Sequence, residues 1–166
     1  MATDPRSVRS APRKSKTAMD TLIWWLILAG RLFVGIVFVY AAYTKLQHPW
    51  MLFAMSVDSY QMLSESGVEF VARVLPWIEL VLGAMLIIGI WVRWAAAAAT
   101  AVLVVFVIAI VRAYTMRLTI NCGCFGTNES LTKFTIVRDA GFLAVSLVVT
   151  VLAFVRRRRL KALRAA

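Results

Sequence analysis

Long apolar segments dominate the chain and recur four times. Each approaches or exceeds the roughly 20 residues that a helix needs to cross a bilayer core about 30 Å thick. They lie at about residues 22–43, 71–91, 94–114 and 136–155. They show no strand-like alternation, and in lipid a segment of this kind satisfies its backbone hydrogen bonds only as a helix. The pattern therefore predicts an all-α polytopic membrane protein, a four-transmembrane-helix bundle.

A shorter apolar pattern separates the first two spans. Between residues 49 and 64, apolar side chains recur at spacings of three and four, after a proline that can open a helix. They are Trp50, Phe53, Ala54, Val57 and Tyr60. Two interpretations fit this pattern. One is a short helix on the outer membrane surface, and the other is an outer loop that packs onto the bundle.

Composition supports the membrane assignment, and the location of the charge decides what the basicity means. The chain is 61% hydrophobic and 16% charged, against about 45–50% and about 25% in soluble domains. Its net charge of +11 would ordinarily suggest nucleic acid, but +10 of it lies in residues 1–20, Arg93 and residues 156–166. We therefore expect no nucleic-acid partner. Residues 1–20 are predicted to be a disordered basic tail, 21–155 the membrane domain, and 156–166 a polybasic tail that binds anionic lipid.

The same charges predict the orientation. Basic residues near span ends concentrate on the cytoplasmic side. With both termini inside, twelve basic residues flank the cytoplasmic ends of the spans, and six lie in the outer loops and outer span ends. The sequence thus predicts a protein of the bacterial inner membrane with cytoplasmic N- and C-termini.

The strongest candidate for chemistry is a pair of cysteines in the second outer loop. Cys122 and Cys124 are the chain's two cysteines, and the predicted orientation exposes them to the oxidising side. A disulfide across one residue closes with strain and is easily reduced; Gly123 and Gly126, beside Phe125, supply backbone freedom. The pair is either a redox-active dithiol, a static disulfide, or two unpaired thiols. Two thiolates without a nearby histidine are too few for a zinc site, so no metal is predicted.

Two ionisable residues lie well inside the first two spans. Arg31 and Glu79 would be costly in lipid unless they are paired or face a polar cavity. Counting from the outer span ends, their depths differ by about 6 Å, which an arginine side chain can cover. We predict that they face each other, either as a structural pair or as part of a polar pocket for a quinone or a small substrate.

A haem site is not expected. His48 is the single histidine, so the chain cannot supply both axial ligands of a b-type haem, and it has no C-x-x-C-H motif. A quinone remains the cofactor that the polar-pocket interpretation would accommodate.

Several of these features together resemble the DoxX-like membrane proteins, specifically their MauE-type branch of methylamine-utilisation proteins. The resemblance covers about residues 22–155, and the Cys122-Gly123-Cys124-Phe125-Gly126 loop is its specific element. The remaining matching residues are Arg31, Gly35, Phe38, Lys45, Leu46, Pro76, Glu79, Gly83, Leu86, Gly89, Arg138 and Asp139. It implies a four-helix membrane bundle linked to redox processes. MauE-type proteins are associated with maturation of a disulfide-rich periplasmic dehydrogenase beside a thioredoxin-like partner, and DoxX-type relatives with quinone-dependent sulfur oxidation.

Two hypotheses of different classes follow. In the first, Cys122 and Cys124 exchange thiol and disulfide with a thioredoxin-like exported partner, in the maturation of an exported or membrane redox protein. Because the chain has no second cysteine pair to pass electrons onward, this relay needs another protein. In the second, the protein is a non-catalytic small subunit or assembly factor of a larger respiratory or photosynthetic membrane complex. The two differ in whether the protein takes part in catalysis at all.

Overall fold

The computed structural model describes residues 14–117 and 132–165 and is helical throughout its regular parts. Its helices are α1 (Lys14–Leu46), α2 (Trp50–Asp58), α3 (Glu65–Ile88), α4 (Val92–Thr115) and α5 (Lys133–Ala165). Four of them, α1, α3, α4 and α5, are long and apolar enough to cross a membrane. No strand forms among the described residues. The predicted all-α fold with four spanning helices is therefore confirmed.

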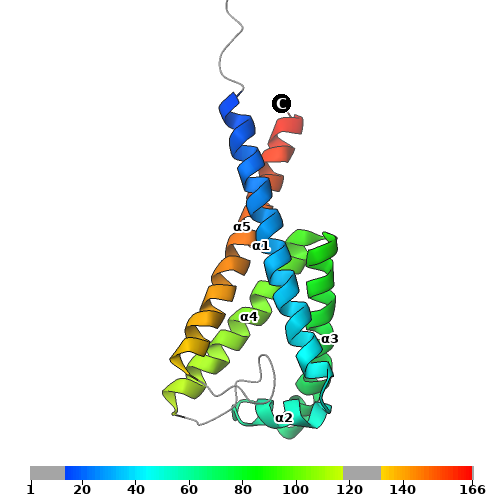
Figure 1. Cartoon of the computed structure of the whole chain (residues 1–166), viewed down its shortest axis with the longest axis vertical. Helices are drawn as coiled ribbons and strands as arrows, with labels where there is room; N and C mark the ends of the chain where they lie inside the picture. The colour runs from blue at the N-terminus through cyan, green and yellow to red at the C-terminus, as the bar shows by residue number, and fades with distance from the viewer. Residues whose placement is uncertain (1–13, 118–131, 166) are drawn as a thin grey trace, which may run out of the picture.

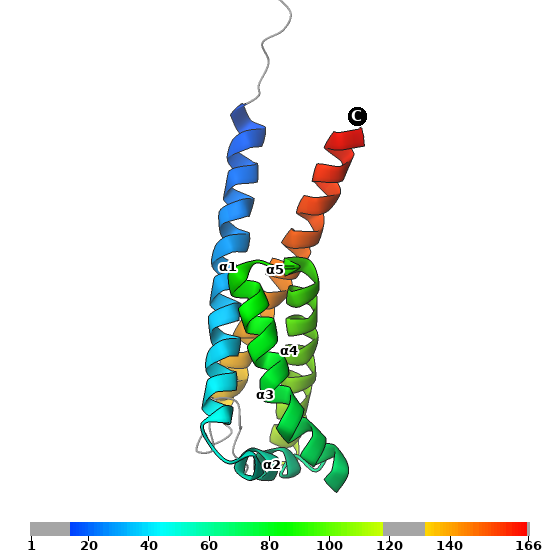
Figure 2. The ribbon, with the colours of Figure 1, turned by 90° about the vertical axis from the view of Figure 1, so that its right-hand side faces the viewer.

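The spanning helices alternate in direction and pack in two pairs (Figure 1). Helix α1 contacts α3, α4 contacts α5, and α1 also contacts α5. Helix α2 lies across one end of the bundle, where α4 ends and α5 begins; we call this the loop end. At the opposite, terminal end, α1 and α5 extend beyond the short turn that joins α3 to α4 (Figure 2). The start of α1 and the end of α5 therefore both lie at the terminal end.

The helices are longer than the apolar segments that predicted them. Helix α1 begins at Lys14 and so includes residues 14–20, which the sequence assigned to the basic tail. Likewise, α5 continues beyond residue 155 to Ala165. Once a span has nucleated a helix, each further residue adds a hydrogen bond without a new nucleation cost. Helix α3 starts at Glu65, six residues before the apolar segment predicted from 71.

The connector between the first two spans contains a short helix. Helix α2 buries Phe53 and Ser56, and the Arg73 guanidinium of α3 lies 4.4 Å from the Trp50 ring centre. This cation–π contact joins α2 to α3. The structure thus has a helix that packs on the end of the bundle, which combines elements of both sequence-based interpretations.

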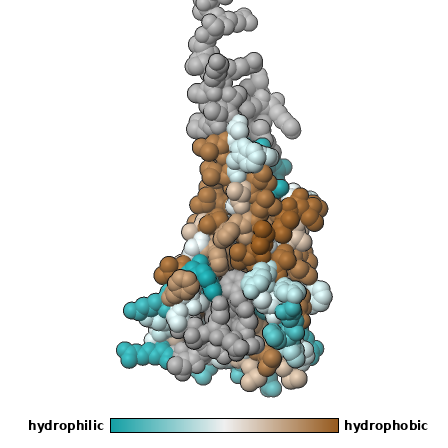
Figure 3. Space-filling model, viewed as in Figure 1, coloured by the Kyte–Doolittle hydropathy of each residue, from teal (hydrophilic) through white to brown (hydrophobic). Residues whose placement is uncertain are grey.

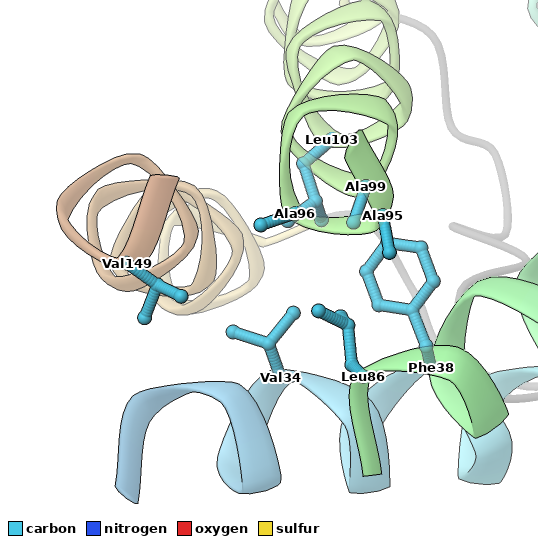
Figure 4. Packing of buried hydrophobic residues seen from close by; sticks show 8 residues of the cluster. All are labelled: Val34, Phe38, Leu86, Ala95, Ala96, Ala99, Leu103 and Val149. Carbon is cyan, nitrogen blue, oxygen red and sulfur yellow. The ribbon is translucent and has the colours of Figure 1, made fainter. Parts of the chain in front are cut away.

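Small residues let the helices approach closely at the centre of the bundle. Figure 4 shows the main hydrophobic cluster, formed by Val34, Phe38, Leu86, Ala95, Ala96, Ala99, Leu103 and Val149. Helices α1 and α3 meet at Gly35 and Gly83, where a Cβ added to Gly83 would lie 2.8 Å from the Gly35 carbonyl oxygen. Outside this core, one face of the molecule carries an apolar band, with hydrophilic residues gathered at the loop end (Figure 3). That division is expected of a membrane-spanning bundle.

Candidate functional site

A buried ion pair joins α1 to α3 in the loop-end half of the bundle. The Lys45 ammonium donates hydrogen bonds to both carboxylate oxygens of Glu79, at 2.9 and 2.8 Å. The two side chains are only 2% and 11% exposed. Lys45 also lies 5.4 Å from the Phe53 ring centre, so α2 covers the pair from the end. Charges this deeply buried are tolerated because each one neutralises the other.

The predicted pairing of Arg31 with Glu79 is wrong, because Glu79 is paired with Lys45. The contact between Gly35 and Gly83 sets the register of these antiparallel helices. It places Glu79 level with about residue 39 of α1, which is eight residues, or about 12 Å, from Arg31.

The direction in which helical side chains lean explains why Glu79 pairs with Lys45 and not with Arg31. Side chains on a helix lean toward its N-terminus. On α1, this carries Lys45 back into the bundle toward Glu79 and carries Arg31 away from it, toward the terminal end. There the Arg31 guanidinium packs against Gly89, where an added Cβ would lie 2.5 Å from Nη1. Counting residues from the end of each span takes no account of this lean.

A second buried acid lies on α5. Asp139 is 3% exposed, and its Oδ1 accepts a hydrogen bond of 3.1 Å from the Nε of Arg138. Tyr60, in the connector after α2, is also buried. Burial, and to a lesser extent the Asp139 carboxylate, raise the pKa of the Tyr60 phenol, which therefore stays protonated at neutral pH.

A small cavity lies between the spanning helices beside the Lys45–Glu79 ion pair. Its volume is about 40 Å³, and all four spanning helices line it. Lys45, Glu79 and Asp139 supply its polar wall, while apolar residues such as Phe38 and Phe106 supply the rest. A cavity of this size has room for a few water molecules at most. The site can therefore hold water or protons among balanced charges, but not a quinone ring.

Buried hydroxyls join α4 to α5 nearer the middle of the bundle. The Thr100 hydroxyl lies 2.8 Å from that of Ser146 and 3.0 Å from that of Thr150, and it donates to the Ala96 carbonyl. The apolar pattern of these two spans did not predict this hydroxyl group cluster. The spacing of Ser146 and Thr150, four residues apart on one helix face, was the available signal.

The cysteine pair and its neighbours Gly123, Phe125 and Gly126 lie outside the described residues. The flanks of their segment are described: α4 is followed by Arg117, and Thr132 precedes α5. Both flanks lie at the loop end (Figure 1). The chain thus leaves and re-enters the bundle on the side that carries α2.

The fold and the buried ion pair define a small multi-pass membrane protein, a four-helix bundle with a polar centre near its loop end. The family model described as methylamine utilisation protein MauE matches residues 23–153, and the chain belongs to this family. It is 31% identical over 134 residues to the methylamine utilization protein MauE of Paracoccus denitrificans, covering 78% of this chain and 72% of that protein. No solved structure matches. The MauE-type resemblance is thus confirmed, whereas the wider DoxX-like link stays a prediction.

Proposed function

We propose that the protein is an accessory membrane protein of methylamine utilisation that exchanges thiol and disulfide with an exported partner through Cys122 and Cys124. The observation that carries the proposal is a pair of cysteines one glycine apart in a MauE-family chain. The flanks of their segment, Arg117 and Thr132, are both held at the loop end by spanning helices. A rigid bundle that presents a short reactive segment is a common arrangement for functional loops.

The proposed location is the bacterial inner membrane, with the terminal end in the cytoplasm. The charge distribution supports this orientation, because Arg93 and the basic residues from Arg156 onward lie at the terminal end. Basic residues are retained on the cytoplasmic side during insertion. The loop end, and with it the cysteine segment, then faces the oxidising compartment.

The exchange step balances without a further oxidant. A thiolate of the reduced pair attacks the disulfide of a thioredoxin-like partner and forms a mixed disulfide, releasing one partner thiolate. The second cysteine of the pair then attacks the sulfur of the first cysteine in the mixed disulfide, and the second partner thiolate leaves. The pair ends as a disulfide and the partner as a dithiol, so two electrons have moved to the partner; the reverse direction uses the same steps.

Single cysteine variants test the proposal. In a strain whose growth on methylamine depends on this gene, Cys122→Ser or Cys124→Ser should accumulate a mixed disulfide with an exported protein, visible on non-reducing gels. Each single variant and the double variant should lose growth on methylamine to the same extent. If the double variant grows normally and still co-purifies with a larger complex, the exchange hypothesis is wrong, and the non-catalytic subunit or assembly factor is the better description.

A further inference from the structure

A second, larger cavity lies at the opposite end of the bundle from the ion pair. It has a volume of about 330 Å³ and opens between α1, the start of α4 and residues 153–157 of α5. Its lining combines four arginines with apolar and aromatic side chains: Trp24, Ile27, Leu28, Arg31, Val92, Arg93, Ala153, Arg156 and Arg157. It is formed where α1 and α5 run beyond the turn between α3 and α4 (Figure 2).

The charge of this cavity is unbalanced. Among the described residues that line it, none is acidic, whereas four are arginines from three helices. The Nε of Arg31, at its inner side, is buried and has no hydrogen-bond partner. A buried donor of this kind is costly to leave unsatisfied. The excess positive charge and the unsatisfied donor favour an anionic ligand in this cavity.

The backbone adds to this preference. Helix α4 begins at the cavity with Val92, and its first turn has no side-chain cap. The free N–H groups of a helix start attract anions such as phosphate. Arg93 is held in place because its guanidinium lies 5.6 Å from the Phe154 ring centre.

We propose that this cavity binds the phosphate group of an anionic phospholipid. Guanidinium groups match phosphate oxygens in charge and in bidentate geometry. The apolar wall of Trp24, Ile27 and Leu28 continues along α1, where the acyl chains can follow the helix into the bilayer. A volume of 330 Å³ is at the lower limit of small-molecule pockets, which suits a head group rather than a whole lipid. This is a site within the bundle, distinct from general attraction between the tails and the membrane.

Lipid titration of the purified full-length protein in a neutral detergent tests the site. The probes are short-chain phosphatidylglycerol, phosphatidylcholine of the same chain length, and inorganic phosphate; the readout is the concentration dependence of the thermal unfolding midpoint. Only phosphatidylglycerol should raise the midpoint in a saturable way. Arg31→Gln and Arg156→Gln should each weaken its apparent affinity at least about tenfold, the loss expected for a charge-assisted bond to phosphate.

Arg158→Gln is the matched control, because Arg158 belongs to the same basic run but does not line the cavity. It should weaken binding clearly less than Arg156→Gln. If both variants weakened the affinity for phosphatidylglycerol equally, the binding would come from the general charge of the tail, and the proposed site would be wrong. Equal responses to phosphatidylglycerol and phosphatidylcholine would also overturn it, and saturable stabilisation by inorganic phosphate would replace the lipid with a soluble anion. Arg156 is exposed, so its variant remains informative even if Arg31→Gln misfolds.

Discussion

Lys45, Glu79 and Arg31 show how the position of one charge in a helical bundle depends on the lean of its side chain. Lys45 belongs to the end of the first span, yet its ammonium is carried into the bundle and neutralises Glu79. Arg31 lies deeper along the same helix, yet its guanidinium is carried out toward the terminal end. Depth in the sequence identified residues that need a partner, but it did not identify the partner.

Removing one member of the buried pair should be far more damaging than removing both. Glu79→Gln removes the carboxylate that neutralises the buried Lys45 cation, and should lower the free energy of unfolding by about 3–5 kcal/mol. Lys45→Met combined with Glu79→Gln should recover much of this loss, because neither charge is then buried. Unfolding of the purified protein in detergent measures both effects.

The exposed pair formed by Glu69 and Arg73 on α3 is the matched control. These residues are also joined by a salt bridge, at 2.7 Å, but their side chains are 50% and 56% exposed. Glu69→Gln should therefore change the free energy of unfolding by no more than about 1 kcal/mol.

If charge reversal of Arg31 and Glu79 together restored stability lost in the single variants, the assignment of Lys45 as the partner of Glu79 would be wrong.

At the scale of helices, the positions of the spans were predictable and their contacts were not. A run of about 20 apolar residues in a bilayer has one way to satisfy its backbone, so its sequence is sufficient to predict a helix. Which face of each helix meets its neighbour depends on close packing. Between α1 and α3, this is decided at Gly35 and Gly83, where a Cβ added to Gly83 would lie 2.8 Å from the Gly35 carbonyl oxygen and one added to Gly35 would lie 3.0 Å from the Gly83 carbonyl oxygen. The glycines were visible in the sequence, but their mutual contact was not.

Gly83→Ala should separate α1 from α3. Its added methyl group would lie 2.8 Å from a backbone oxygen, so the helices have to shift, at a cost of about 1–3 kcal/mol. Gly141→Ala on α5 is the control, since no atom lies within 4 Å of its added methyl group. It should leave stability unchanged or raise it slightly through helix propensity. Thermal unfolding of the two variants side by side checks the contact; equal effects would argue against it.

At the scale of the whole molecule, two polar regions lie at opposite ends of the bundle. The loop end holds two ion pairs, Lys45–Glu79 and Arg138–Asp139, and the terminal end holds a cavity with four arginines. The net charge therefore differs between the two ends of the bundle. Such a distribution favours one orientation in the membrane, and it places the proposed thiol exchange and the proposed lipid site on opposite faces.

This polarity leads to a labelling prediction. With Cys124→Ser, the remaining Cys122 thiol should react with a membrane-impermeant maleimide in intact spheroplasts after mild reduction. In a background without native cysteines, Ser10→Cys should react only after the membrane is permeabilised. Labelling of residue 10 from outside, with Cys122 protected, would reverse the proposed orientation.

The sequence alone determined that the chain forms four membrane-spanning helices, because apolar length and the hydrogen-bonding needs of a backbone in lipid leave one solution. It also identified Glu79 and Arg31 as charges requiring an explanation. Only the tertiary structure decided that Lys45 neutralises Glu79, and that Arg31 joins Arg93, Arg156 and Arg157 around one cavity. These outcomes depend on helix register, on close glycine contacts and on side-chain lean, which are properties of packed helices and not of any single segment.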